Sequence, residues 1–423
     1  MLFINSVLFI VFCLAGLYFL FNEGRMIHNP LIKKQDYFAT GPQIFFILSI
    51  ATGMCMLGEY NSTRLFIWIV FMAIGVFVAK GGMKFSLALI FYILYILYLF
   101  ASLFVTPDKW YGIRVIAKYL YPLLVLLFAA KVTDSEFVVF SGIKYLLIMG
   151  LFIEISYIFW LPWTSWGVFW IVATFADHLS VLCVIALALF YATSKKKYLY
   201  LLLFFFSYSV ISAVRTGLIG ITVSLIVFFI VKYKWKAMPV VVLVFVAAIF
   251  VVLYVPGVRD KMFRKQMTAE EIVENRENLS MKDIDNSGRQ AMWDWSLENY
   301  YQNNKIYGSG IGNLQMVFYS DENPFAHPVV HNDYVQILCD TGLVGLSLFL
   351  LIAICLVVHT FFIYNNKQNN QAIRLCAIVA GSSLVGILAT SYTDNAVNYS
   401  LATYFYPYAF YGMALGLMKK YNR

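Results

Sequence analysis

The chain has 423 residues, of which 61% are hydrophobic and 13% are charged. A soluble domain contains about 25% charged residues, so this composition excludes an ordinary soluble domain and predicts a protein that lies in lipid. The formal net charge of +9 is typical of a nucleic-acid-binding protein when a chain is soluble. In a membrane protein we attribute it to topology, and we expect no nucleic acid partner.

Long apolar runs predict membrane-spanning helices. The runs that reach or approach the about 20 residues needed to cross the hydrocarbon core are Leu2–Phe21, Phe85–Val105, Phe137–Trp160, Trp166–Ala192 and Ala237–Val255. The first run lacks a basic leader and a small-residue cleavage site, which favours a retained helix over a secretion signal. We therefore predict an all-α polytopic integral membrane protein with about 12 to 13 transmembrane helices.

Lysine and arginine gather in every second connection between the predicted spans. In chain order, these basic connections contain Arg25 with Lys33 and Lys34, Lys80 with Lys84, Lys131, Lys195–Lys197, Lys232–Lys236, Lys367 with Arg374, and Lys419–Arg423. The positive-inside rule places all of them in the cytoplasm. Two spans separate the basic connections at 195–197 and 232–236, so the turn that joins these spans reaches the outer face and carries Arg215.

The same alternation predicts three parts of the chain. Residues 1–255 form N-terminal transmembrane helices, residues 256–332 form an extracytoplasmic loop with short helices, and residues 333–423 form C-terminal transmembrane helices. The chain is expected to re-enter the membrane at about Gly342.

Two basic residues are candidates for anion binding at the outer face. Arg215 lies within an apolar stretch, where an arginine is costly unless it binds an anion or reaches the headgroups by snorkelling. Ser287 is predicted to cap a short helix that places Arg289 and Trp293 on one face. A guanidinium beside an indole can hold a phosphate with an attached sugar, although a helix that rests on lipid gives the same pattern.

Glycines and histidines follow in the same loop. The segment "YGSGIGN" contains Gly308, Gly310 and Gly312, whose amides could face an anion; a flexible turn is the alternative.

Pro328 suits a first helical position and predicts a helix that starts at His327 or Pro328, with His331 in its first turn. A neutral imidazole there can act as a general base, and His327 binds or orients.

No motif predicts a metal site or a cofactor. The spacing HxxxH lacks a carboxylate on the same face and is incomplete as a zinc site. The six cysteines contain no CxxC pair and are expected to pack in apolar surroundings. The "DID" at Asp283–Asp285 lies on the wrong side of the membrane for nucleotide sugars, and we interpret it as chance. Asp177 and His178 lie within a predicted span. They either line a cavity or mark the polar end of this span.

The segments "SAVRTGL", "GRQAMW", "GSGIGN" and "HNDYVQILCDTGLVGLSLF", in this order, resemble the O-antigen ligase and polymerase superfamily. The resemblance covers about Arg215 to Leu350 and rests on hydropathy elsewhere. Members are bacterial inner-membrane glycosyltransferases that use undecaprenyl-diphosphate-linked glycans. The resemblance therefore implies a GT-C-like glycosyltransferase architecture in the bacterial inner membrane, with the active site on the periplasmic face.

The resemblance also implies roles for individual residues. His331 is expected to act as the catalytic base, while Arg215 and Arg289 hold the diphosphate in place of a divalent metal. The positions expected to bind substrate are His327, Asn332, Tyr334, Gln336, Trp293, Gly308, Gly310 and Gly312. Tyr334 is alternatively an anchor at the membrane interface. The implied partners are an undecaprenyl-diphosphate-linked donor and acceptor, the bilayer, a chain-length regulator and a flippase.

Several functions stay open at this stage. A polymerase passes the glycan to another lipid-linked repeat, whereas a ligase passes it to the lipopolysaccharide core; the aromatic-rich C-terminal segment and the compact loop favour the polymerase. A polyprenyl-linked glycan transporter or flippase is an alternative, but transporters usually place their binding residues near the bilayer midplane. A peptidoglycan polymerase would need a catalytic carboxylate in the loop, for which Asp294 and Glu298 are candidates.

Overall fold

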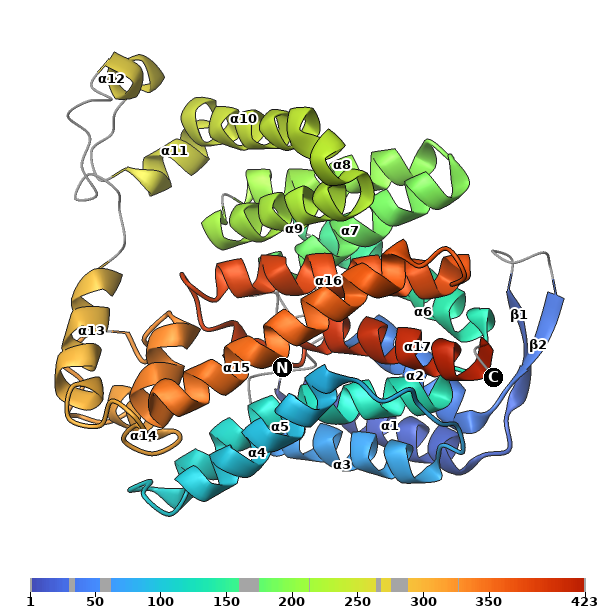
Figure 1. The fold of residues 1–423 in the computed structure, drawn as a ribbon, viewed down its shortest axis with the longest axis horizontal. Coiled ribbons are helices and arrows are strands. Elements are labelled where there is room, and N and C mark those ends of the chain that lie inside the picture. Colours follow the sequence, from blue (N-terminus) through green and yellow to red (C-terminus); the bar gives the residue numbers. More distant parts are fainter. Residues whose placement is uncertain are drawn as a thin grey trace.

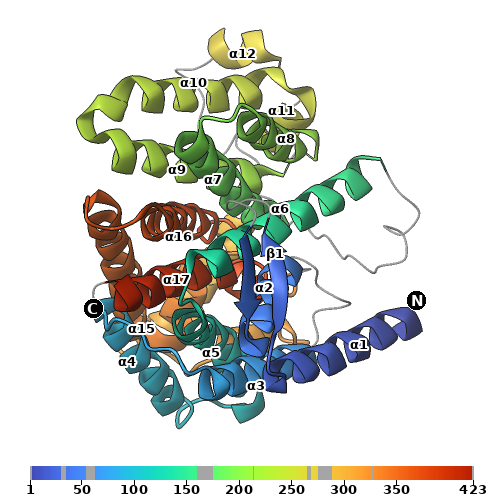
Figure 2. The same ribbon diagram turned by 90° about the vertical axis from the view of Figure 1, so that its right-hand side faces the viewer.

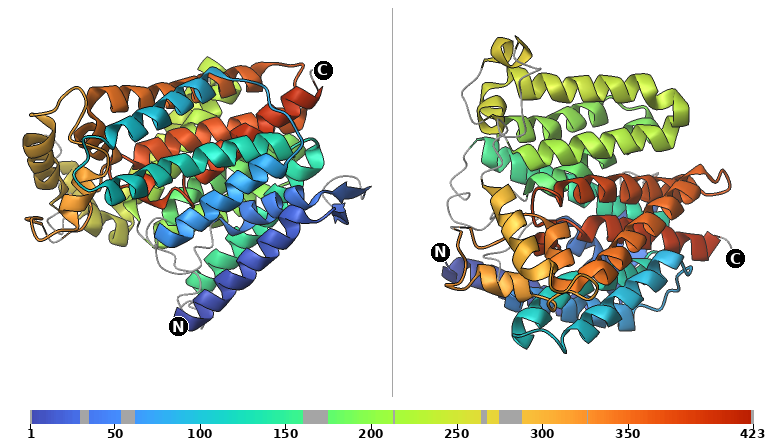
Figure 3. Two further views of the ribbon diagram at one scale, coloured as in Figure 1. Left: turned by 90° about the horizontal axis from the view of Figure 1, so that it is seen from below. Right: turned by 60° about the vertical axis from the view of Figure 1, so that its left-hand side comes forward.

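The computed structural model describes residues 2–29, 35–53, 62–159, 175–212, 214–263, 268–274, 288–325 and 327–421. The helices form three layers, with α7–α10 in the upper layer of Figure 1, α15–α17 in the middle and most of the N-terminal helices below. The same stacking is visible from a second direction in Figure 3. Ser287 and the Asp283–Asp285 motif lie outside the described residues.

The elements of the first half are α1 (Leu2–Phe21), β1 (Arg25–Asn29), β2 (Gln35–Ala39), α2 (Gly41–Thr52), α3 (Ser62–Val78), α4 (Leu87–Ser102), α5 (Lys109–Val132), α6 (Glu136–Ile158), α7 (Phe175–Thr193) and α8 (Lys197–Ile211). The second half continues with α9 (Arg215–Tyr233), η2 (Lys234–Ala237), α10 (Met238–Tyr254), α11 (Pro256–Met262), α12 (Ala269–Glu274), α13 (Arg289–Ser296), η3 (Leu297–Tyr301), α14 (Asn313–Phe318), α15 (Asp333–Asn365), α16 (Gln371–Thr390), η4 (Ala396–Tyr399) and α17 (Phe405–Tyr421).

The all-α polytopic membrane class is confirmed. Within the described ranges, five helical stretches are long and apolar enough to cross a membrane: Lys109–Val132, Glu136–Ile158, Arg215–Tyr254, Asp333–Asn365 and Gln371–Thr390. Further apolar helices, such as α4 and α8, are shorter. The stretch Arg215–Tyr254 joins α9 and α10 through the η2 turn. The number of about 12 to 13 crossings stays a prediction.

Small residues let the central helices pack closely. On α17, a Cβ added to Gly412 would lie 2.4 Å from the carbonyl oxygen of Leu126, and one added to Gly416 would lie 2.4 Å from that of Ala130. Backbones that approach this closely gain van der Waals contact in lipid, where apolar side chains gain little from association alone. By contrast, no residue of α10 is buried, which suits a helix that faces lipid.

A two-stranded antiparallel hairpin pairs Arg25–Asn29 with Gln35–Ala39. From the sequence this stretch is expected to be a connection, and the two strands are not predicted. Figure 2 faces the hairpin, which lies at the same end of the molecule as the C-terminus. We call this the hairpin end; the opposite end in Figure 1, which carries α13 and α14, is the loop end.

Basic connections predicted to be cytoplasmic meet at the hairpin end. The backbone of Lys131 lies against Gly81, and the side chain of Lys419 lies against Gly82. These contacts bring together three connections that the positive-inside rule assigns to one side of the membrane.

Helix α15 breaks at Gly342, which has φ 64° and ψ −165°. The break frees the amides of Leu343 and Val344, and they donate to the carbonyls of Lys305 and Ile306 at 2.9 and 3.1 Å. The short helix before the break therefore belongs with the loop end, and the long helix after it begins where we expect the chain to re-enter the membrane.

Gly342→Ala is expected to destabilise the fold by about 2 kcal/mol or more, because its left-handed φ and its close contact both disfavour a side chain. A Cβ at Gly342 would lie 2.3 Å from the carbonyl oxygen of Ile306. Gly288→Ala is the matched control, since Gly288 has φ 76° and no atom of the described residues lies within 4 Å of an added Cβ. Thermal unfolding in detergent measures both variants, and equal losses in Tm would contradict the role of the contact.

Candidate active site

The segment before α15 and the segment after α16 meet at the loop end. Asn332 caps α15, because its side-chain oxygen accepts from the amide of Val335 at 3.0 Å. The amide of Asp333 donates to the carbonyl of Ser391 at 2.9 Å. The predicted helix start at His327 or Pro328 is wrong: α15 begins at Asp333. The helix starts after the side-chain cap of Asn332 and not at Pro328, because the cap satisfies a backbone amide of the first turn.

His331 lies just before this cap and faces a carboxylate. Its Nδ1 is 3.1 Å from Oδ1 of Asp394, and the two side chains are 21% and 9% exposed. Since Nδ1 faces the carboxylate, Nε2 is the ring nitrogen left to accept a proton. His331 has φ 51°, an uncommon conformation for a residue with a side chain, and the surrounding contacts must hold it there.

Asp394 is not among the residues predicted from the sequence, in which residues 391–417 stand out only as an aromatic-rich segment. The available signal was an acidic residue at the predicted outer end of a span. Ser391, at the start of the same loop, shares a hydrogen bond of 3.0 Å with the hydroxyl of Tyr404. Burial, and secondarily the nearby Asp333, raises the pKa of the Tyr404 phenol well above its usual value, so this partner stays neutral.

Helix α13 reaches the same loop from the other side. Nη1 of Arg289 donates to the carbonyl of Thr393. Four residues later, Nε1 of Trp293 donates to the carbonyl of Val330 at 2.9 Å, and its ring meets that of Tyr392 edge-on at 5.4 Å. One face of α13 therefore holds both the loop and the residue that precedes His331.

Arg215 is the first residue of α9 and lies at the same end. A Cβ on Gly220 would lie 2.8 Å from Thr390 and one on Gly386 would lie 1.9 Å from Ser224, so α9 and α16 run antiparallel. An α-helix rises 1.5 Å per residue, which places Arg215 about 7.5 Å beyond the contact at Thr390, level with the loop that contains Asp394.

The structure thus brings Arg289 and His331 together through residues 391–394 and places Arg215 at the level of that loop. His327 remains exposed, and its ring lies 5.8 Å from that of His331, nearly perpendicular to it.

Four of the predicted sugar contacts are engaged with the protein instead. Asn332 and Gln336 are 1% and 7% exposed, and Gln336 accepts from the side chain of Asn395 at 3.0 Å. The hydroxyl of Tyr334 donates to the carbonyl of Leu388 at 2.6 Å. Trp293 is 9% exposed. These contacts give the four side chains structural roles, and those of Gln336 and Trp293 reach the loop around Asp394 through Asn395 and Tyr392. Direct contact of the four with a sugar stays a prediction.

The segment "YGSGIGN" at 307–313, which we call the glycine loop, uses backbone amides to bind an acidic residue of the same chain, Asp340. The amide of Gly310 donates to the carbonyl of Asp340, while the amides of Gly312 and Leu314 donate to its carboxylate at 3.0 and 2.8 Å. Gly308 lies so close to the backbone of Asp340 that an added Cβ would be 2.4 Å away. Asp340 uses the amides of Gly310 and Gly312, and the amide of Gly308 donates to the carbonyl of Asn304 at 2.8 Å. These glycines therefore pack the loop against α15, and their role in binding a substrate anion stays a prediction.

No group of three or more His, Cys, Asp or Glu side chains in the described ranges has an arrangement that could hold a metal ion. Independence from metal stays a prediction. Asp177 and His178 lie in α7, but their side chains lie outside the described part of the structure. Asp294 is exposed and accepts from Gln290 at 2.8 Å.

No curated protein matches the chain. The family model described as O-Antigen ligase matches residues 199–350, a range that contains Arg215, Arg289 and His331 but not Asp394. This match, over a segment that supplies three of the groups at the loop end, supports the resemblance of the chain to the O-antigen ligase and polymerase superfamily.

Proposed function

We propose that the protein is an O-antigen polymerase, a glycosyltransferase that joins undecaprenyl-diphosphate-linked oligosaccharide repeats into a surface polysaccharide. The proposed site faces the periplasm at the outer face of the bacterial inner membrane. The observation that carries this proposal is the pairing of His331 with Asp394 at 3.1 Å, on the loop that also binds Arg289. This pairing supports a site in which a base and a cationic group act where a hydroxyl in water meets a diphosphate held in lipid.

In the proposed reaction, a hydroxyl of the acceptor sugar attacks the anomeric carbon of the donor. The new bond joins the acceptor oxygen to this carbon, and the bond from the carbon to the diphosphate oxygen breaks. His331 accepts the hydroxyl proton at Nε2, because Nδ1 faces Asp394. The electron pair of the broken bond leaves with the undecaprenyl diphosphate.

Arg215 and Arg289 are proposed to bind the leaving diphosphate. Guanidinium groups form strong, charge-assisted hydrogen bonds to phosphate and stabilise charge that develops as the bond breaks. Their two positive charges are proposed to take the place of a divalent cation. The lipid-embedded helices next to the loop are proposed to bind the polyprenyl tail through their apolar side chains.

Asp394 is proposed to orient the imidazole and to stabilise the imidazolium that forms. We expect Asp394→Asn to lower kcat about 10-fold or more with little change in the KM of the donor, because ring orientation affects the transition state and not binding. Steady-state kinetics of the reconstituted enzyme measure both constants. Asn395→Ala is the neighbouring control for disturbance of the loop, since Asn395 binds Asp333 and Gln336 and not the imidazole. A loss in KM alone for Asp394→Asn would contradict the orienting role.

A reconstituted assay separates the candidate functions. The purified protein in vesicles receives lipid-linked repeats alone, and a ladder of products supports a polymerase. A single transfer that occurs only after lipopolysaccharide core is added supports the ligase. Movement of labelled lipid across the bilayer without transfer would support a flippase. The chain-length regulator and flippase proposed as partners are tested by adding them to the same vesicles.

A further inference from the structure

Helix α5 carries two cations at the loop end that no part of the proposed mechanism uses. Arg114 and Lys118 are one turn apart and follow Trp110 on the same stripe of the helix. This end of α5 packs against the glycine loop: a Cβ on Gly112 would lie 3.0 Å from the carbonyl oxygen of Ile311.

The ammonium of Lys118 is held by neutral groups. It donates to the side-chain oxygens of Asn398 at 2.6 Å and Gln315 at 3.1 Å. An ammonium has three N–H donors, so among the described residues one donor of Lys118 remains for a further acceptor. Among the described residues, the ion pairs are Arg259 with Asp260 and His331 with Asp394, and neither includes Lys118.

Two buried carboxylates face the same region, those of Asp333 and Asp340, but both are bound elsewhere. Asp333 accepts from the side chain of Asn395 at 3.1 Å and from the amide of Val397 at 3.1 Å. The carboxylate of Asp340 accepts from two amides of the glycine loop and its end. Neither carboxylate forms an ion pair or a hydrogen bond with Lys118 among the described residues, so neither occupies its third donor.

Arg114 is oriented by aromatic rings. Its guanidinium carbon lies 5.3 Å from the ring centre of Trp110 and 5.2 Å from that of Tyr111. Within the described part of the chain, its Nε atom has no hydrogen-bond partner. A guanidinium fixed against rings keeps its planar fork of donors available for a phosphate at low cost in conformational entropy.

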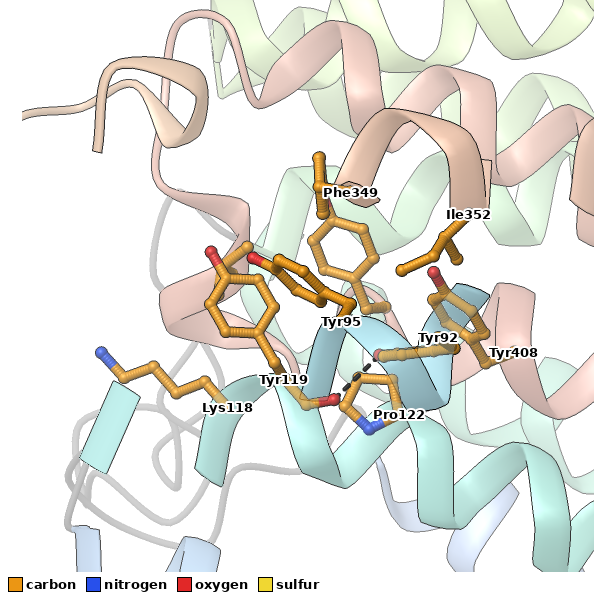
Figure 4. Close-up of a pocket in the computed structure, with 10 residues that line it drawn as sticks. Tyr92, Tyr95, Lys118, Tyr119, Pro122, Phe349, Ile352 and Tyr408 are labelled. Atoms are coloured by element: carbon orange, nitrogen blue, oxygen red, sulfur yellow. Dashed lines mark hydrogen bonds between the residues drawn. The ribbon is translucent and has the colours of Figure 1, made fainter. Parts of the chain in front are cut away.

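A cavity of about 10 Å³ lies behind Lys118 and is lined by aromatic residues such as Tyr95, Tyr119 and Tyr408. This is about the space of a single water molecule and excludes a phosphate. In Figure 4 the ammonium points away from the labelled rings. An anion that binds Lys118 therefore approaches from the side of Asn398 and Gln315.

The two cations lie close to the proposed active site. Arg289 binds the loop at Thr393, before Asp394, whereas Lys118 binds it at Asn398, four residues after Asp394. Because an extended chain spans at most about 3.6 Å per residue, the Cα atoms of Asp394 and Asn398 are separated by less than about 14 Å. The two contacts therefore lie on either side of the His331 partner along one short loop.

We propose that Arg114 and Lys118 bind the phosphate group of the glycolipid acceptor, at a subsite distinct from the donor site of Arg215 and Arg289. This inference rests on the proposed function. In polymerisation the donor diphosphate lies at the reacting carbon. The attacking hydroxyl of the acceptor lies at the end of the repeat that is remote from its own diphosphate. The two diphosphates then need separate sites, and the cations of α5 supply the second one.

The test uses the full-length enzyme in vesicles with a donor whose terminal hydroxyl is blocked, so that it cannot act as acceptor. Single lipid-diphosphate-linked repeats are varied as acceptor, and the same oligosaccharide without phosphate serves as a second acceptor. We expect Arg114→Ala and Lys118→Met each to raise the KM of the phosphorylated acceptor about 10-fold or more. The KM of the donor and the rate with the phosphate-free acceptor should stay at wild-type values.

Lys144→Met is the matched control, because Lys144 is also half-buried, on α6, the next helix along the chain, with its ammonium 5.2 Å from the ring centre of Tyr145. Lipopolysaccharide core is tested as a third acceptor. If the Arg114 and Lys118 variants raise the KM for the core alone, the subsite binds a phosphate of the core and not that of a lipid-linked repeat. An unchanged KM for every phosphorylated acceptor in folded Arg114 and Lys118 variants overturns the subsite. Failure of the wild-type enzyme to transfer any glycan overturns the proposed function itself.

Discussion

The variant His331→Ala is expected to lose glycan chain extension, with turnover of the reconstituted enzyme about 10²- to 10⁴-fold below wild type. The imidazole is the only proposed acceptor for the hydroxyl proton, and its Nδ1 lies 3.1 Å from Asp394, which leaves Nε2 to accept that proton. Removing the ring leaves the arginines and the acceptor site in place. The KM of the donor should therefore change little while kcat falls.

His327→Ala is the appropriate control, since His327 is the exposed neighbour whose ring lies 5.8 Å from that of His331. It should retain most of the wild-type kcat if His331 alone is the base, whereas a change confined to KM would fit the predicted role of His327 in binding substrate. Thermal unfolding and detergent chromatography establish that both variants insert and fold. Chain extension at the wild-type rate by purified His331→Ala protein would falsify the assignment of the base.

Hydropathy and charge alternation predict the class of the protein and the gathering of polar groups at one end. These signals are strong because lipid penalises unpaired backbone groups and charges over whole segments. The pairing of His331 with Asp394 has no comparable signal. The two residues are 63 positions apart, and their contact depends on how the ends of α15 and α16 meet. Tertiary packing decides such a contact, and no local pattern carries it.

The glycine loop and Trp293 illustrate a second limit of the sequence. Alternating glycines predict amides that face an anion, and the loop does bind one, but that anion is Asp340 of the same chain. Trp293 lies on the predicted face of its helix, yet its indole donates to Val330 at 2.9 Å instead of reaching solvent. In both cases the chemistry of the residue is foreseen, while its partner is set by the fold.

Arg289→Ala is expected to lower kcat about 10²- to 10³-fold, the usual effect of removing a donor that stabilises charge in the transition state. Arg289→Lys should retain part of the rate, because an ammonium keeps the charge but loses the planar fork that matches a phosphate. Arg289 also donates to the carbonyl of Thr393, so loss of activity alone does not separate catalysis from support of the loop.

Added guanidinium ion separates these two roles. A small cation that enters the space left by Arg289→Ala can restore charge at the diphosphate, whereas it cannot restore the covalent connection from α13 to the loop at Thr393. We expect rescue of kcat with guanidinium and a weaker response to sodium. Arg259→Ala is the control for general charge loss in the 256–332 segment, since Arg259 pairs with its neighbour Asp260 at 3.4 Å. If guanidinium leaves the rate of Arg289→Ala unchanged while its Tm falls well below wild type, Arg289 supports the loop and the diphosphate depends on Arg215.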